Sequence, residues 1–363
     1  MRVIMAGGGT GGHIYPALAI ARGIQVRWPQ AEIVFAGTKE GLENTIIPET
    51  GFKLMTISAQ GLDRSSLIKA AGSLLQVPLG FWQARNIIKE FKPNIVIGTG
   101  GYVSYPVVLA ASIMQVKTVI HEQNAFPGLA NRALAKRVDR VLLTFPGAAA
   151  HFPSEVTHHT GLPVRPEISS ATRKEAADFF QLREDKFTLL VVGGSRGSLR
   201  INQATTELLK KYKDKDIQLV WVTGPQHFEV LSKALEEEKL PGNMRVFPYL
   251  FNMEMGWAIA DLAVCRAGAT TLSELTVRGL PAILIPYPYA AEGHQEKNAR
   301  YLEDKGAALI IVDEFLDEQT LFDKIESLRQ NKFRLLRMAQ IMKEEGRLRA
   351  LDDILDVIQD VMG

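Results

Sequence analysis

Cysteine is nearly absent from this sequence of 363 residues, which contains only Cys265 and so cannot form an internal disulfide. No Cys/His spacing typical of a metal site occurs either, and this cysteine usage fits a reducing cytoplasm. Excess charge is also lacking, because 42 Lys and Arg face 40 Asp and Glu, and a net charge of +2 does not indicate a nucleic-acid-binding protein. The contents of 46% hydrophobic and 23% charged residues exclude a wholly disordered chain.

Long apolar runs are scarce as well. The apolar run at the N-terminus is too short for a signal peptide and is typical of a first buried strand. Residues 95–116 form the longest stretch without charge, but glycines, a proline and polar residues interrupt it, so we expect a strand, a loop and a helix there. We therefore expect an intracellular protein with no membrane contact other than a peripheral one.

Short apolar runs alternate with longer amphipathic segments, which predicts an α/β fold with parallel sheets covered by helices. The length favours two domains, and Pro163 and Pro166 favour an extended connection between them. The segment from Phe333 onward is helical by its period. The strands expected in the first half are 3–6, 33–36, 54–57, 95–97, 118–121 and 140–144, and those in the second half are 188–192, 218–223, 245–248, 262–265, 282–286 and 308–312.

A glycine turn follows the first strand of each half. Residues 3–13 read VIMAGGGTGGH, and residues 189–198 read LLVVGGSRGS. Such a turn lets backbone N–H groups at a helix N-terminus approach an anion, although glycines also make tight turns in any doubly wound sheet. The repetition of the pattern indicates two similar nucleotide-type domains.

The letters of the first turn, Gly7, Gly9 and Gly12, also match a dinucleotide-binding motif. That site needs an acid at the end of the second strand, whereas Glu32 lies at the start of that strand. His13 follows the turn and places an imidazole beside the predicted anion site, which suggests acid–base chemistry. A ring that is only hydrogen-bonded locally is the alternative.

A second candidate site follows the strand 262–265, where the sequence reads CRAGATTLSEL. Hydroxyls and unpaired amides at a helix start suit a diphosphate, and Glu274 offers a carboxylate for two ribose hydroxyls. Alternatively, a Thr or Ser caps this helix and Glu274 completes a capping box. Further along, His294 and Gln295 could orient sugar hydroxyls, although a solvated helix start would look similar.

Together these motifs resemble those of the bacterial UDP-N-acetylglucosamine transferases that act on undecaprenyl-diphospho-muramoyl-pentapeptide. The resemblance covers nearly the whole chain. It implies two Rossmann-like domains facing a cleft, the glycosyltransferase B type, with residues 1–163 and a returning helix 342–363 as the acceptor- and membrane-facing domain. Residues 164–341 are then the UDP-sugar-binding domain. The matching segments are 8–17, 100–106, 121–132, 161–165, 265–269 and 295–299.

The same resemblance implies roles for individual residues. The diphosphate lies near Ser195 and the start of the helix after Cys265, Glu274 holds the ribose, and Arg165 and the backbone of Leu250 lie near the uracil. Asn124 and Gln295 meet the N-acetylglucosamine. The sequence departs from many relatives at Arg196, Ser198 and His294, which leaves the role of Arg196 open. The implied binding residues are Thr10, Gly11, Gly12, Asn124, Arg165, Ser195, Leu250, Ala269, Thr270, Thr271, Leu272, Ser273, Glu274 and Gln295.

The chemistry implied by the resemblance is an inverting transfer to the 4-hydroxyl of the muramoyl sugar. His13 is the candidate base, and helix N-termini with hydroxyls stabilise the departing UDP, so neither a metal nor a cofactor is expected. The only Asp-x-Asp, residues 214–216, lies in a charged run typical of a solvated helix end. The expected partners are UDP-N-acetylglucosamine, the lipid-linked acceptor, the membrane surface and other cell-wall synthesis proteins, and no nucleic acid is expected.

The segment 65–89 is the candidate membrane contact, at the cytoplasmic face of the cell membrane. Its apolar residues would enter the interface while flanking cations meet anionic headgroups, although an ordinary buried helix with a loop is the alternative. The apolar residues are Leu74, Leu75, Val77, Leu79, Phe81 and Trp82, and the cations are Arg64, Lys69, Arg85 and Lys89.

Two other functions remain open from the sequence. One keeps the fold but makes the protein a UDP-sugar epimerase or a transferase with another acceptor. The other is a nucleotide-sugar-binding scaffold that recruits wall-synthesis proteins without catalysis.

Overall fold

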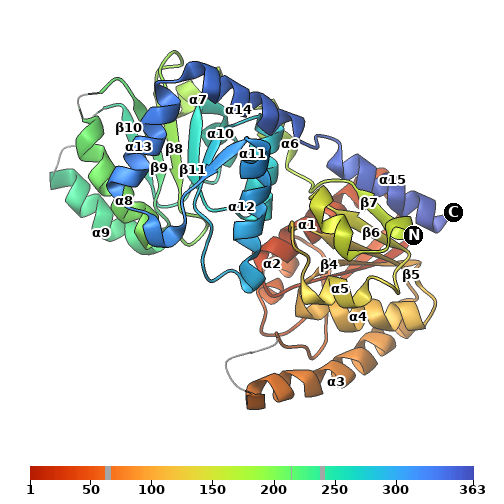
Figure 1. Ribbon diagram of the computed structural model, residues 1–363. Coiled ribbons are helices and arrows are strands. Elements are labelled where there is room, and N and C mark those ends of the chain that lie inside the picture. Colours follow the sequence, from red (N-terminus) through yellow and green to blue (C-terminus); the bar gives the residue numbers. More distant parts are fainter. Residues whose placement is uncertain (62–66, 214, 238–241) are drawn as a thin grey trace. The chain divides into compact units, whose positions relative to one another are not determined.

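The chain folds into two compact units, each of the α/β class (Figure 1). The computed structural model describes residues 1–61, 67–213, 215–237 and 242–363. Unit 1 consists of Met1–Val164 together with Arg349–Gly363, and unit 2 consists of Arg165–Leu348. Each unit has its own parallel sheet, as the alternation of apolar and amphipathic segments predicted.

Unit 1 is built on a seven-stranded parallel sheet in the order β3-β2-β1-β4-β5-β6-β7. Six strands were expected, and each lies within a few residues of its predicted position. The seventh, β7, has the sequence Thr-His-His, which carries no apolar signal, and pairing with β6 holds it in the sheet. The strands are β1 (Arg2–Gly7), β2 (Glu32–Gly37), β3 (Lys53–Thr56), β4 (Ile95–Gly100), β5 (Lys117–Glu122), β6 (Arg140–Leu143) and β7 (Thr157–His159).

Helices cover both faces of this sheet. One core lies between the sheet and the helices α3, α4 and α5, and the other lies between the sheet and the helices α1 and α15. The strands read as continuous apolar runs because both of their faces are buried. The helices of unit 1 are α1 (Gly11–Arg27), α2 (Glu43–Glu49), α3 (Leu67–Phe91), α4 (Gly101–Ile113), α5 (Leu129–Leu134) and α15 (Ala350–Met362), with the short η1 (Pro146–His151) and η2 (Ser154–Val156).

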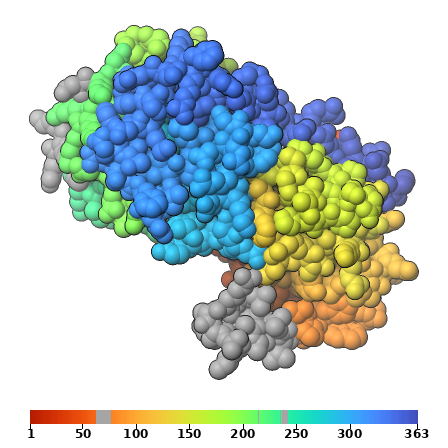
Figure 2. Space-filling model, viewed as in Figure 1, coloured from red at the N-terminus to blue at the C-terminus, as the bar shows by residue number. Residues whose placement is uncertain are grey.

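The prediction of one helix over 342–363 was wrong, because two separate helices cover this part of the chain. α14 (Lys332–Glu344) packs on α11 and α13 within unit 2 and ends before Gly346, where a Cβ would lie 2.7 Å from the carbonyl oxygen of Thr276. The chain then enters unit 1 as α15, which packs along α1. Figure 2 shows α15, in dark blue, on the surface of unit 1.

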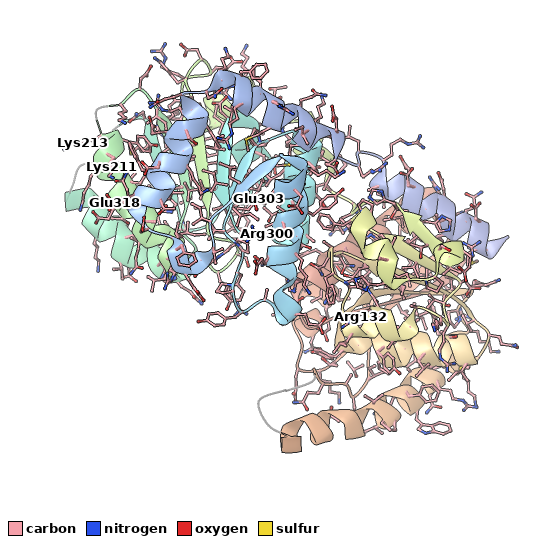
Figure 3. The ribbon with its side chains drawn as sticks, in the orientation of Figure 1. Arg132, Lys211, Lys213, Arg300, Glu303 and Glu318 are labelled. Atoms are coloured by element: carbon pink, nitrogen blue, oxygen red, sulfur yellow. The ribbon has the colours of Figure 1, made fainter. Side chains whose placement is uncertain are left out.

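Unit 2 has a six-stranded parallel sheet in the order β10-β9-β8-β11-β12-β13. Its core surrounds Trp221 and Tyr212, both almost fully buried. Lys211 of α8 and Glu318 of α13 join two covering helices through an ion pair of 2.9 Å (Figure 3). The strands are β8 (Thr188–Val192), β9 (Gln218–Val222), β10 (Met244–Phe247), β11 (Leu262–Cys265), β12 (Ala282–Leu284) and β13 (Ala308–Ile310).

The remaining elements of unit 2 are helical. They are α6 (Pro166–Ser170), α7 (Arg173–Phe180), α8 (Leu199–Tyr212), α9 (Pro225–Glu237), α10 (Met253–Ile259), α11 (Ala269–Arg278), α12 (His294–Lys305), α13 (Glu318–Arg329) and α14, with the short η3 (Ala291–Gly293) and η4 (Asp313–Phe315).

Both glycine turns lie where the order of strands reverses. In unit 1 the reversal falls between β1 and β4, and in unit 2 it falls between β8 and β11. Ligands of open parallel sheets bind outside the carboxyl ends of the strands at such switch points. The topology therefore places one candidate anion site in each unit.

Candidate functional site

The first glycine loop, residues 7–12, presents unpaired amides at the start of α1. Thr10 is the N-cap residue in extended conformation, and its side chain makes no capping hydrogen bond. Gly11 and Gly12 begin the helix, and in the described part of the chain their N–H groups have no partner. The first turn of α1 contains no acid. These features favour an anion at this point.

A buried carboxylate fixes the shape of this loop. Glu43 is fully buried, and its Oε2 accepts a hydrogen bond of 3.0 Å from the N–H of Gly9. Its Oε1 accepts from the N–H of Thr38 at 3.0 Å and from the Thr38 hydroxyl at 2.7 Å. Three hydrogen bonds therefore engage both oxygens of this buried carboxyl group. Glu43 could not be predicted as part of the site, because no local pattern marks it as a partner of a loop 34 residues away.

His13 lies in the first turn of α1 with a defined ring orientation. Its Nδ1 is 3.0 Å from the carbonyl oxygen of Thr99 and 3.1 Å from Oε1 of Gln123. Because a carbonyl oxygen only accepts, Nδ1 carries the proton, and Nε2 of the neutral ring then carries the lone pair. Gly100 has φ +96° and its α-carbon lies so close to the ring that a Cβ there would be 2.9 Å from Nδ1. The ring can therefore act as a base through Nε2.

The loop after β5 is held by the carboxylate of Glu122. Its Oε1 accepts from the backbone N–H of Asn124 at 3.0 Å and from the Asn124 side chain at 3.3 Å. Its Oε2 accepts from Asn131 Nδ2 at 2.8 Å and from the N–H of Gly128 at 3.1 Å. Arg132 of α5, labelled in Figure 3, lies 5.0 Å from the ring of Phe126 in the same loop. Asn124 is therefore presented by a loop with a fixed shape.

The second glycine loop, residues 193–198, lies at the N-terminus of α8 in unit 2. Gly197 has φ +81°, and a Cβ at this position would lie 2.2 Å from the carbonyl oxygen of Thr223, so only glycine fits. Ser195 and Arg196 are exposed on the loop. No ion pair of Arg196 occurs with any described residue.

Arg266 ties this loop to its neighbours. Its Nη1 lies 2.5 Å from Oδ1 of Asp313, and its Nη2 donates to the hydroxyl of Ser198 at 2.6 Å. Ser198 also caps α8 by accepting from the N–H of Ile201. Arg266 belongs to a motif that the sequence singled out, but its partner Asp313 is 47 residues away and gave no signal.

The start of α11 is the second site with unpaired amides. Gly268 is the N-cap residue, and no side chain caps the helix. The N–H groups of Ala269, Thr270 and Thr271 have no partner in the described residues, and the first turn contains no acid. The capping box that was the alternative role for Glu274 is therefore wrong.

The next two residues of α11 support the helix instead of lining its exposed end. Leu272 is fully buried, and its N–H makes the first helical hydrogen bond to Gly268, 3.0 Å long. Ser273 is also buried. Of the residues that the sequence placed at this helix start, Ala269, Thr270 and Thr271 are the ones available to a ligand.

Glu274 lies one turn into α11, mostly buried. Trp257 Nε1 donates to its Oε2 at 2.8 Å. Burial raises the pKa of the Glu274 carboxyl, and the Trp257 hydrogen bond and the positive charge of Arg165 act in the opposite direction. Arg165 itself lies 3.4 Å from the carboxylate of Glu254, and Leu250 packs buried nearby against Gly256. Arg165 and Glu274, expected to bind uracil and ribose, thus belong to one neighbourhood, to which Trp257 was not predicted to belong.

Gln295 joins two loops near the start of α12. Its Oε1 accepts from the N–H of Ala267 at 3.2 Å and from the N–H of Tyr287 at 3.0 Å. The side-chain amide is therefore oriented, with Nε2 as the donor available to a ligand. His294 Nδ1 lies 2.7 Å from the carbonyl oxygen of Ala291. Further along α12, Arg300 and Glu303 pair with each other at 2.7 Å (Figure 3).

The carboxylates of the described residues are not grouped as a metal site. Among the residues that the structure describes, no group of three or more His, Cys, Asp or Glu side chains could hold a metal ion. In the run 214–216, Asp216 is exposed and pairs with Lys186 at 2.5 Å, and Asp214 lies outside the described residues. This pairing agrees with the interpretation of the run as a solvated helix end.

The candidate membrane segment is partly visible in α3, whose side chains are described from Gln76 onward. Leu79 and Trp82 are 52% and 57% exposed, and the guanidinium of Arg85 lies 5.3 Å from the Trp82 ring. Phe81 packs against the core of unit 1 and is not part of this surface. Within the described residues, no helix has the length and apolar content needed to span a membrane. Arg64 and the side chains of Lys69, Leu74 and Leu75 lie outside the described residues.

Comparison with known protein families gives two matches that together cover most of the chain. Residues 3–143 match the glycosyltransferase family 28 N-terminal domain, and residues 188–354 match the glycosyltransferase family 28 C-terminal domain. The first match contains the loop 7–12 and His13. The second contains the loop 193–198 and the start of α11.

Full-length relatives are also found. The chain is 47% identical over 369 residues to a protein of Desulforamulus reducens and 46% identical over 368 residues to one of Desulfitobacterium hafniense, covering at least 99% of each chain. Both are named UDP-N-acetylglucosamine–N-acetylmuramyl-(pentapeptide) pyrophosphoryl-undecaprenol N-acetylglucosamine transferase. Among solved structures, Acinetobacter baumannii MurG is similar over 99% of both chains, with a TM-score of 0.81 and 28% identity.

Proposed function

Because this chain belongs to glycosyltransferase family 28, we propose that it transfers N-acetylglucosamine from UDP-N-acetylglucosamine to the lipid-linked muramoyl-pentapeptide, a step of peptidoglycan synthesis. The observation that carries the proposal is the full-length identity to transferases of this name, 47% for one of them. The loop 7–12 and the start of α11 support it, since each offers unpaired helix amides to an anion.

Unit 2 binds the nucleotide sugar in this proposal. The diphosphate accepts hydrogen bonds from the amides of Ala269, Thr270 and Thr271, with Ser195 on the neighbouring loop. Glu274 accepts hydrogen bonds from the ribose hydroxyls, and Arg165 and the backbone of Leu250 lie on the uracil side. Gln295 donates through Nε2 to a hydroxyl of the transferred sugar.

Unit 1 supplies the base and receives the acceptor. Nε2 of His13 accepts the proton of the 4-hydroxyl while its oxygen attacks the anomeric carbon. The bond from that carbon to the β-phosphate oxygen breaks, and its electron pair leaves with UDP. Because the hydroxyl attacks from the face opposite the α-linked UDP, the configuration inverts and the product linkage is β. Thr10, Gly11 and Gly12 contribute from the loop beside His13, and Asn124 contacts the sugar.

The charge that develops on the departing UDP needs stabilisation in the transition state. The N-terminus of α11 supplies it through unpaired amides and a favourable dipole, and the N-terminus of α8 adds its dipole, with no acid in the first turn of either helix to oppose it. We propose that these groups suffice without a metal ion or a cofactor.

The test is UDP release by the full chain, measured with donor plus lipid-linked acceptor, with donor alone, and with both in the presence of a chelator. We expect release that requires the acceptor and persists with the chelator. The variant His13→Ala should lower turnover by about 10² or more while donor affinity stays near its original value. Near-normal turnover of this variant would remove His13 from the role of base.

Other results of the same assay would identify other functions. Conversion of the donor to an epimer without acceptor would indicate a UDP-sugar epimerase. Donor binding without UDP release under any of these conditions would indicate a non-catalytic scaffold.

We also propose that α3 brings the protein to the cytoplasmic membrane surface, where a polyprenyl-linked acceptor resides. Leu79 and Trp82 expose apolar surface, and Arg85 and Lys89 on the same helix can meet anionic headgroups. Membrane-bound cell-wall synthesis proteins are the candidate protein partners at this surface.

Cosedimentation with phosphatidylglycerol vesicles tests this membrane contact. Leu79→Ser with Trp82→Ser should lower the bound fraction several-fold. Leu348→Ser is the matched control, since Leu348 is 65% exposed but belongs to unit 2. Binding that the double variant leaves unchanged would exclude α3 as the contact.

A further inference from the structure

A chain of hydrogen bonds runs from His13 into the interior of unit 1. Gln123 is almost fully buried, and its Oε1 is one of the two acceptors at Nδ1 of His13. On its other side, Gln123 Nε2 donates to the carbonyl oxygen of His121 at 2.9 Å and lies 3.0 Å from His121 Nδ1. His121 is fully buried, and its Nε2 lies 2.9 Å from the carbonyl oxygen of Gly161.

The carbonyl oxygens at the inner end determine the direction of every bond in this chain. Gly161 O only accepts, so His121 Nε2 carries a proton, and Nδ1 of the neutral His121 ring is an acceptor. Both this nitrogen and the carbonyl oxygen of His121 need a donor, so Nε2 of the Gln123 amide must face them. Oε1 of Gln123 is thereby directed at His13 and can only accept from Nδ1.

We infer that Gln123 and His121 are positioning residues, which hold His13 with its proton on Nδ1 and its lone pair on Nε2. This inference rests on the proposed function, in which Nε2 is the base. Thr99 O also accepts from Nδ1, so rotation of the ring about its Cβ–Cγ bond breaks two hydrogen bonds instead of one. The second acceptor therefore strengthens the restraint on the plane of the ring.

The protonation state of His121 protects this arrangement. A second proton on His121 would make Nδ1 a donor that faces the Gln123 N–H groups, and relief of this conflict would turn the Gln123 amide around. The amide would then present N–H groups to a His13 Nδ1 that already carries a proton. Burial lowers the pKa of His121 to about 4, so the ring stays neutral at physiological pH.

The network assigns opposite tautomers to its two histidines, and this assignment can be measured without any assay of activity. Two-bond ¹⁵N–¹H correlation spectra of the full chain with labelled histidine report which nitrogen of each ring is protonated. The spectra of His13→Ala and of His121→Phe assign the two rings among the seven histidines. We expect protonated Nδ1 in His13 and protonated Nε2 in His121.

The variant Gln123→Met keeps the side-chain length but removes both ends of the amide. We expect His13 to populate both tautomers and kcat to fall roughly tenfold or more, since a general base in the wrong tautomer cannot accept the proton. KM for UDP-N-acetylglucosamine should not change. Gln25→Met is the matched control, because Gln25 is exposed on the same helix as His13. It should alter neither the tautomers nor kcat.

The outcomes separate the network from the function. Either histidine in the opposite tautomer in the wild-type chain, or a Gln123→Met variant with unchanged His13 tautomer and unchanged kcat, would overturn the inference. The wild-type spectrum decides the first point even if the variant fails to fold. Absence of transfer by a wild-type chain that shows both expected tautomers would instead refute the proposed function, and with it the positioning role.

Discussion

His121 is a buried titratable residue whose environment links the stability of unit 1 to pH. Burial lowers the pKa of its ring to about 4 from an ordinary value of 6.5. The unfolded chain therefore binds a proton near pH 6.5 that the folded chain does not bind until about pH 4. The contribution of the neutral His121 ring to the free energy of unfolding is therefore fully present above pH 6.5 and is lost as the pH falls toward 4.

We expect the titration of His121 to lower the free energy of unfolding by roughly 3 kcal/mol over this pH range. Urea unfolding of the wild type and of His121→Phe between pH 7.5 and 4.5 measures it, and the variant should show a weaker dependence on pH. His151→Phe is the control, because His151 is exposed and belongs to the same unit. Equal slopes for the wild type and His121→Phe would contradict the prediction.

Glu274 combines a cost in stability with the role in donor binding that we propose for it. Its pKa is raised chiefly by burial, so the favourable contribution of the protonated form is present at low pH and is lost as the pH rises through the raised value. The fold is therefore less stable above the raised pKa than at acidic pH.

Glu274→Gln should raise Tm at pH 7.5, and the gain should shrink at acidic pH, where the wild-type carboxyl is also neutral. The same variant should raise KM for the donor about tenfold, because charge-assisted hydrogen bonds to the ribose are lost. Glu296→Gln, an exposed change on α12, is the control. A lower Tm with unchanged donor KM would contradict both roles of Glu274.

At the residue scale, the sequence located groups but not their partners. His13, Glu274 and Gln295 could be singled out because each follows a strand and a loop of small or polar residues. The contacts of Glu43 with Gly9, of Trp257 with Glu274 and of Asp313 with Arg266 join distant segments, and no local pattern encodes them. Whether the singled-out residues bind the donor stays a prediction.

At the scale of the element, α11 begins without a side-chain cap and without an acid in its first turn. Ala269→Asp would place a negative charge there. This charge would stabilise the helix by about 0.3–1 kcal/mol through its dipole but would repel a diphosphate. We expect Tm of the ligand-free protein to stay level or rise and donor affinity to fall tenfold or more.

Isothermal calorimetry with UDP and differential scanning calorimetry measure the two effects of Ala269→Asp. Ala269→Ser is the neutral control of similar size. Unchanged UDP affinity in the Asp variant would mean that the diphosphate does not bind at this helix start.

The strands were the easiest elements to predict. Both faces of each sheet are covered, so a strand appears in the sequence as an uninterrupted apolar run such as Leu262–Cys265. β7 was missed because its residues are polar and half-buried. The break between α14 and α15 was missed because helical periodicity continues across it, and the close packing of Gly346 against Thr276 at the break joins residues 70 apart in the sequence.

At the scale of the whole molecule, α15 belongs to the core of a unit that is distant from it in sequence. Ile354, Leu355, Ile358 and Val361 are buried with residues of α1 and β1. Ile358→Ala should destabilise unit 1 by about 3 kcal/mol, because it leaves a cavity in that core. Unit 2 should keep its stability and its affinity for UDP.

Scanning calorimetry with and without UDP separates the two units, since a ligand of unit 2 raises only the transition of unit 2. We expect Ile358→Ala to lower the transition that UDP leaves unchanged. Gln359→Ala, an exposed change on the same helix, should have little effect. A loss of UDP affinity in Ile358→Ala would show that the two units do not behave independently.

The return of residues 349–363 to unit 1 makes unit 2 an insertion within the chain of unit 1. During translation, every residue of unit 2 is made before the last helix of unit 1. Until α15 has left the ribosome, α1 exposes the apolar surface that α15 will cover. A chain that ended before α15 would contain all of unit 2 but would leave this surface of unit 1 open to chaperones.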